Sequence, residues 1–323
     1  MPVIDIGSWV GFSDQTSSLV AKKDASSSLI SGLDDVKRQS VSEQWNHAFH
    51  RYGCAVIVGH GIPESIFRDV NAEALEFFHQ SVEYKMGFNH GKYGHPRGGY
   101  TGLGQETVAL STDATADSTV SSSGAVGIPK SDPVENFVFT GQPSAHRSPQ
   151  GCSSPLPRAD AYYDLMTRLL SVIHRISSDA LGITDLDFFE QFYDPNVTGN
   201  EYMGKNGNAL RLAYYPPIHT NLASDRIDLN GGDAVVSSAS CDDKIRYGAH
   251  TDYQGFTLLR PDESDWHDVV TDGAVTARAG GLEVYDQSLR RWIPVVIPPL
   301  LNALVINAGR YTRCCFDCNG MMS

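Results

Sequence analysis

Apolar positions recur with a helical period in three parts of the first 180 residues. One face begins after Ser42 and is closed by Gly53; it consists of Trp45, Ala48, Phe49 and Tyr52. A second helix is predicted from about Pro63. The longest stripe predicts a third helix that ends before Gly182, and it consists of Leu165, Leu169, Val172, Ile173, Ile176 and Ala180. Two apolar runs, PVIDI at 2–6 and CAVIVGHGI at 54–62, are typical of short strands.

After about residue 205 the pattern changes to short runs rich in β-branched and aromatic residues. These runs are LRLAYYP, RYGAHTD, FTLL, GLEVYD, WIPVVI and ALVIN. Short strands in series predict a sandwich or barrel rather than alternating strand and helix units. Two separators, 222–244 and 261–279, exceed the usual length of a connection, so we expect loop insertions there. Residues 107–131 are rich in Ser, Thr, Ala and Gly without a period, which predicts a disordered loop.

Composition narrows the class of partner. The chain has 323 residues, 41% of them hydrophobic, and a formal net charge of −13. A broad contact with nucleic acid or an anionic membrane needs a Lys/Arg surface, so we expect neither and favour a small-molecule substrate. The N-terminus lacks the basic and apolar segments of a secretory leader, and no run approaches the roughly 18 apolar residues of a membrane helix. The sequence therefore predicts a cytoplasmic protein with reduced cysteines.

The tripeptide His250-Thr251-Asp252 is the strongest candidate for chemistry. If residues 246–252 form a strand, His250 and Asp252 point to the same face. One nitrogen and one carboxylate donor on one surface suit Fe(II) in a two-histidine, one-carboxylate site that keeps positions open for substrate and O2. The alternative is a hydrogen-bonded pair on a polar strand face, and the tripeptide alone does not decide between the two.

Several motifs in order carry a family resemblance. LRLAYYPP, RYGAHTDYQGFTLL, GGLEVYDQSLRRWIPV and ALVINAG follow one another in the second half, and VIDI, AFHRYGCAVIVGHGIPESI and ALEFFHQSVEYKMGF precede them. Over most of residues 1–309 the chain resembles the isopenicillin-N-synthase-like branch of the 2-oxoglutarate/Fe(II)-dependent dioxygenases. The resemblance implies an α+β fold with a mainly β core. Its double-stranded β-helix, or jelly-roll barrel, would occupy 205–309, and the flanking helical region 1–204.

The resemblance also assigns roles to residues. It makes His250 and Asp252 catalytic ligands of Fe(II), and it places Tyr215 at a position that often contacts 2-oxoglutarate. Ala213 stands where many plant members have Asn, and a core aromatic pair of Tyr214 and Tyr215 is the alternative. The implied cofactors are Fe(II), 2-oxoglutarate and O2. The implied reaction converts 2-oxoglutarate to succinate and CO2 while a small molecule is hydroxylated, desaturated or ring-closed.

Beyond Gly309 the sequence departs from the family. The distal histidine and the Arg-x-Ser that the family carries after this point are not found in residues 310–323, where three cysteines stand and neither strand alternation nor a helical stripe is visible. We therefore expect a divergent, irregular tail, a barrel lacking its last strands, and impaired catalysis. Two alternatives remain: a catalytically dead variant that binds a ligand or partner, and an oxidase of the same fold that does not use 2-oxoglutarate.

Overall fold

The computed structural model describes the chain in thirteen ranges: 1–11, 27–89, 99–105, 133–140, 155–190, 208–216, 247, 249–252, 255–262, 267–271, 274–286, 289–297 and 302–319. The loop expected at 107–131 and the insertion expected at 222–244 lie outside these residues. None of the helices in the described part of the chain combines the length and the apolar character of a membrane span.

The predicted helices and strands of the first half are present. The helices are α2 (Ser27–Arg51), α3 (Glu64–Phe78), α4 (Val82–Met86), α5 (Pro157–Ala180) and α6 (Arg310–Asn319). The strands are β1 (Val3–Asp5), β2 (Cys54–Val58), β3 (Gly99–Thr101), β4 (Glu135–Thr140), β5 (Ala209–Tyr214), β6 (Phe256–Leu259), β7 (His267–Thr271), β8 (Ala274–Asp286), β9 (Arg291–Ile297) and β10 (Leu304–Ala308). Gly53, with a φ of 71°, lets the chain turn from α2 directly into β2.

A four-stranded sheet joins the two ends of the chain. Its strand order is β1-β2-β10-β6, with β1 and β2 parallel and β10 antiparallel to both of its neighbours. The pairing of β10 with β6 sets Asn307 opposite Thr257. Because β1 and β2 belong to the N-terminal half, the halves predicted at 1–204 and 205–309 share one sheet.

Two three-stranded sheets complete the β structure, in the orders β3-β4-β5 and β7-β8-β9. The second of them corrects the loop insertion expected at 261–279, because β7 and the start of β8 fall within it. Val and Thr, which favour strands, recur in β7 and in β8, and these two strands pair antiparallel across a connection of two residues. The described residues thus form a mixed helix and sheet structure in which the sheets do not close into a barrel.

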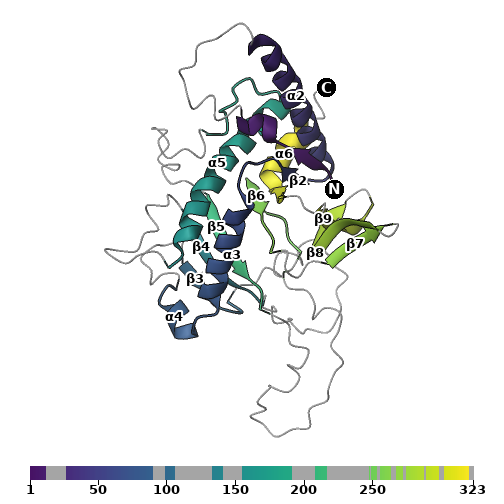
Figure 1. Cartoon of the computed structure of the whole chain (residues 1–323). Coiled ribbons are helices and arrows are strands. Elements are labelled where there is room, and N and C mark those ends of the chain that lie inside the picture. The colour runs from purple at the N-terminus through teal and green to yellow at the C-terminus, as the bar shows by residue number, and fades with distance from the viewer. Residues whose placement is uncertain are drawn as a thin grey trace.

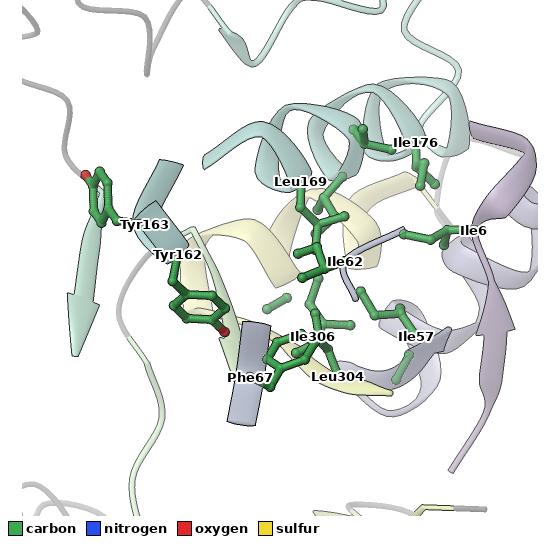
Figure 2. Close-up of a cluster of buried hydrophobic side chains, with 14 of the residues drawn as sticks. Ile6, Ile57, Ile62, Phe67, Tyr162, Tyr163, Leu169, Ile176, Leu304 and Ile306 are labelled. Carbon is green, nitrogen blue, oxygen red and sulfur yellow. The ribbon is translucent and has the colours of Figure 1, made fainter. Parts of the chain in front are cut away.

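The main hydrophobic core lies between the helices and the four-stranded sheet. Figure 2 shows Leu169 and Ile176 of α5 above Ile306 and Leu304 of β10, with Ile57 of β2 beside them. The indole Nε1 of Trp45 on α2 donates a hydrogen bond of 3.0 Å to Ser177 Oγ on α5. The helical stripes predicted from the sequence are therefore the faces that build this core.

The C-terminal segment is a helix, so the prediction of an irregular tail was wrong. Phe316 on α6 is fully buried, and its ring stacks on that of Phe49 with 5.3 Å between the centroids. Figure 1 places α6 beside α2, close to β2 and β6. The sequence pattern did not reveal α6 because this single aromatic residue, rather than an apolar stripe, anchors it in the core.

Candidate metal centre

His250 and Asp252 lie in an irregular segment that runs directly before β6. The prediction of a strand at 246–252 was wrong for residues 247 and 249–252, the part that the structure describes. Two backbone bonds explain how the segment is held without a strand ladder. The Arg310 amide donates to the Asp252 carbonyl at 2.7 Å, and the Gly309 amide donates to the Gly255 carbonyl at 2.9 Å. The start of α6 therefore fixes the backbone beside Asp252.

The two side chains nevertheless converge as the sequence predicted. His250 Nε2 lies 3.3 Å from Asp252 Oδ1, and 33% and 27% of the two side chains are exposed. Both groups are thus accessible from one side and supported from the other. An imidazole nitrogen and a carboxylate oxygen at this distance form either an ion pair or two ligands of one metal ion.

The second carboxylate oxygen of Asp252 is fixed by two donors. Thr257 Oγ1 donates to Oδ2 at 2.6 Å, and Asn307 Nδ2 donates to the same oxygen at 2.7 Å. These donors stand opposite each other in the β6–β10 pairing, so the sheet itself orients the carboxylate. Because both bonds go to Oδ2, Oδ1 is the oxygen presented to His250.

Hydrogen bonding also keeps Asp252 ionised. The bond with His250 is the largest cause that lowers the pKa of Asp252 well below its usual range; partial burial opposes it, and the bonds from Thr257 and Asn307 lower the pKa further. An ionised carboxylate is the form that binds a metal ion.

The donor pair fits one divalent ion. Two ligands about 2.1 Å from an ion and at right angles to it are roughly 3 Å apart, close to the separation of His250 Nε2 and Asp252 Oδ1. Within the described ranges, no group of three or more His, Cys, Asp and Glu side chains is placed to hold an ion. Among those residues, the pair therefore stands as two donors of a candidate metal site.

An aromatic side chain supports His250. The ring of Tyr247 meets the His250 ring edge to face, with 5.0 Å between centroids. Tyr247 in turn accepts a hydrogen bond of 2.9 Å from Arg211 Nη1, and its ring lies 6.3 Å from that of Tyr215. Arg211 and Tyr215 belong to β5 and the residue after it, so the second sheet reaches the candidate metal centre through Tyr247.

The two adjacent tyrosines of the sequence motif divide between core and site. Tyr214 stacks on Phe78 of α3 with 5.3 Å between centroids and an interplanar angle of 12°, and its hydroxyl lies 3.3 Å from His79 Nε2. Tyr215 is 36% exposed and contacts Tyr247 instead. Tyr214 therefore packs against the core, as the alternative of a core aromatic pair predicted, whereas Tyr215 does not.

Four further residues belong to the site although no sequence motif pointed to them: Thr257, Asn307, Tyr247 and Arg211. A signal existed for Arg211, because it lies two and four residues before Ala213 and Tyr215 on the same strand face. Thr257 and Asn307 meet Asp252 only through a pairing between strands about fifty residues apart, which no local pattern reveals.

Comparisons with known proteins find relatives of this chain among oxygenases. Residues 24–136 match the family described as non-haem dioxygenase in morphine synthesis, N-terminal. The 2-oxoglutarate-Fe(II) type oxidoreductase ppzC of Metarhizium rileyi is 26% identical over 289 residues, covering 85% of this chain and 65% of its own length. The oxidoreductase hxnY of Emericella nidulans, of the same type, is 23% identical over 280 residues, with coverages of 86% and 66%. The chain thus spans just under two thirds of the length of these relatives.

Solved structures share the fold. A full-length Neurospora crassa protein, in complex with alpha-KG and thymine, aligns with a TM-score of 0.57 and 18% identity, over 97% of this chain and 74% of that one. The Arabidopsis thaliana dioxygenase for auxin oxidation 1, bound to 2-oxoglutarate, aligns with a TM-score of 0.54 and 16% identity, over 97% and 80%. In its N-terminal part the chain thus matches a non-haem dioxygenase family, and over most of its length it is similar to 2-oxoglutarate-Fe(II) type oxidoreductases.

Proposed function

We propose that the protein is an Fe(II)- and 2-oxoglutarate-dependent oxidoreductase that hydroxylates, desaturates or ring-closes a small molecule with O2. The observation that carries the proposal is the geometry of His250 and Asp252. Their donor atoms lie 3.3 Å apart, and the Asp252 carboxylate is ionised and oriented by two further hydrogen bonds. The names of the relatives, which give both 2-oxoglutarate and Fe(II), support the same cofactors.

In this proposal each residue has a distinct task. His250 and Asp252 bind Fe(II), and Thr257 and Asn307 hold the carboxylate so that Oδ1 faces the ion. Tyr215, exposed beside Tyr247, contacts the 2-oxoglutarate carboxylate. When bound, the iron supplies the oxidising power by coupling O2 to the decarboxylation of 2-oxoglutarate. For the fold we propose an incomplete jelly-roll within residues 205–309, flanked by the helices of 1–204, with α6 packed on α2 through Phe316.

Succinate formation tests the proposal. The purified protein is incubated with Fe(II), ascorbate and 2-oxoglutarate in air, and succinate is quantified by mass spectrometry. We expect succinate above the no-protein blank and its loss in His250→Ala. His47→Ala is the matched control, because His47 lies on the exposed face of α2 and should leave the rate unchanged. Equal succinate from the protein and from His250→Ala would overturn the proposal.

Two other outcomes separate the competing functions. A folded protein that binds 2-oxoglutarate without forming succinate would be the ligand-binding variant. Fe(II)-dependent O2 consumption that does not require 2-oxoglutarate would identify the oxidase of the same fold. Each outcome is read from the same preparation by measuring O2 uptake beside succinate.

A further inference from the structure

The imidazole of His250 has a side-chain contact that favours one orientation of its ring. Residues 249–252 lie outside the strands of the described chain, so no strand ladder fixes the backbone of His250 there. Its ring meets the ring of Tyr247 with 5.0 Å between centroids and an interplanar angle of 85°. An edge-to-face contact depends on the angle between the two rings, so rotation of the imidazole would weaken it. Tyr247 therefore restrains the rotation of His250.

Tyr247 is itself contacted by two residues of the second sheet. Arg211 Nη1 donates to the Tyr247 hydroxyl at 2.9 Å, and the guanidinium carbon lies 5.2 Å from the centroid of the same ring. The Tyr215 ring meets Tyr247 with 6.3 Å between centroids and an interplanar angle of 82°. Because side chains alternate along an extended chain, Arg211 and Tyr215 project from the same face. One strand face thus orients a ring that follows Arg211 by 36 residues in the sequence.

The strand that carries Arg211 is a firm support for these contacts. Its backbone pairs with β4 from Ala209 to Tyr214, and Leu210 and Leu212 pack against the main core. Arg211 also has further interactions within the protein, so its guanidinium is engaged by the protein itself. A side chain with a fixed backbone and several partners is suited to orient a neighbour rather than to capture a ligand.

We propose that Arg211 and Tyr247 are positioning residues for the candidate metal centre: Arg211 orients Tyr247, and Tyr247 keeps the His250 imidazole where Nε2 lies beside Asp252 Oδ1. Groups behind a metal-binding histidine commonly set its ring orientation and the metal affinity. Here an aromatic ring and an arginine have that task. The inference rests on the proposed function for the metal that is bound, and it makes the affinity of the site depend on β5, a strand of another sheet.

Titration with Co(II) measures the effect on the metal centre. Metal-free protein is titrated with Co(II), and the visible absorption of the bound ion reports its Kd. Tyr247→Leu should raise this Kd about tenfold or more. Arg211→Met should raise it about threefold to tenfold, the size of one lost hydrogen bond. Tyr285→Leu is the matched control, because Tyr285 is exposed on β8 against Trp292, and its Kd should stay within about twofold of the wild type.

A double variant tests whether Arg211 acts through Tyr247. If it does, Arg211→Met raises the Kd in the wild type and leaves it unchanged in the Tyr247→Leu background, because effects within one chain of contacts are not additive. Tyr247→Phe keeps the ring and loses the hydroxyl that accepts from Arg211, so it should recover much of the binding lost in Tyr247→Leu. Equal effects of Arg211→Met in both backgrounds would overturn the proposal.

The spectrum of the saturated protein separates positioning from stability. A residue that only stabilises the fold lowers the urea midpoint and leaves the absorption of bound Co(II) as in the wild type. A residue that orients a ligand changes this absorption, because the geometry around the ion changes. We expect changed spectra for Arg211→Met and Tyr247→Leu. Arg211→Lys and Tyr247→Phe serve in their place if circular dichroism shows that either variant does not fold, and spectra identical to the wild type would contradict the positioning role.

The metal-free protein supplies a readout that requires no metal binding. The ring protons of His250, assigned by their absence from the NMR spectrum of His250→Ala, are shifted by the nearby ring of Tyr247. If Arg211 orients Tyr247, Arg211→Met moves these resonances towards their positions in Tyr247→Leu at the same pH. Such a movement supports the positioning role even if the protein forms no succinate, and resonances that stay in place would overturn it.

Discussion

Truncation of Phe316 gives a direct measure of how firmly α6 belongs to the fold. The side chain is fully buried and its ring stacks on Phe49 at 5.3 Å. A buried phenylalanine removes about 150–250 Å² from water, worth about 4–6 kcal/mol at about 25 cal/mol per Å². That value is an upper estimate because unfolded chains are partly compact, and Phe→Ala substitutions in cores cost about 3–5 kcal/mol. We therefore expect Phe316→Ala to lower the free energy of unfolding by about 3 kcal/mol.

Urea unfolding followed by far-UV circular dichroism measures this loss. Cys314→Ala is the matched control, because Cys314 lies on the exposed side of the same helix and its substitution should change stability by less than about 0.5 kcal/mol. The two variants should differ in midpoint and share the slope of the wild type. Equal midpoints would show that α6 does not pack as described. Since the Arg310 amide holds the Asp252 carbonyl, Phe316→Ala should also weaken metal binding.

Three other predictions concern single side chains. Thr257→Val removes one donor to Asp252 Oδ2 and should weaken Fe(II) binding about tenfold to a hundredfold in an anaerobic titration. The control Thr257→Ser should bind Fe(II) as the wild type does. Equal Fe(II) affinities of Thr257→Val and the wild type would contradict the assigned role. Burial raises the pKa of the Cys54 thiol from 9.0 to about 11, so the stability it contributes, about 3 kcal/mol, is complete below pH 9 and is lost as the pH rises through 11. Urea unfolding of Cys54→Ala should lack this alkaline loss, and parallel pH profiles of the variant and the wild type would contradict the prediction. Burial lowers the pKa of His60, whose Nδ1 accepts from the Ile62 amide, so stability should fall as the pH drops below 6.5. In the same assay His60→Gln should flatten that slope, and an unchanged slope would contradict the role of His60.

The sequence predicted those elements whose stability is local. The stripe that contains Trp45 and Phe49 became α2, and the stripe that ends at Ala180 became α5, because a helical face that packs on a core keeps its period along the chain. The strands β2 and β10 were predicted for a similar reason, since central strands buried on both faces are continuously apolar.

Elements held by distant partners were not predictable. Residues 249–252 follow a strand-like pattern, yet the Asp252 carbonyl accepts from the Arg310 amide at the start of α6, about sixty residues away. The helix α6 itself depends on the contact of Phe316 with Phe49, which no periodicity within residues 310–319 reveals. At the candidate site the sequence predicted that His250 and Asp252 meet, and the structure confirms it. Their support by Thr257 and Asn307 required the strand register.

The most direct test of the central claim is the stoichiometry of metal binding by His250 and Asp252. Anaerobic protein is titrated with Fe(II), and bound iron is measured by elemental analysis after desalting, for the wild type, Asp252→Ala and the control Asp35→Ala, whose carboxylate is exposed on α2. We predict one iron per chain for the wild type and the control, and almost none for Asp252→Ala. Equal iron in all three proteins would contradict the assignment of this pair as a metal centre.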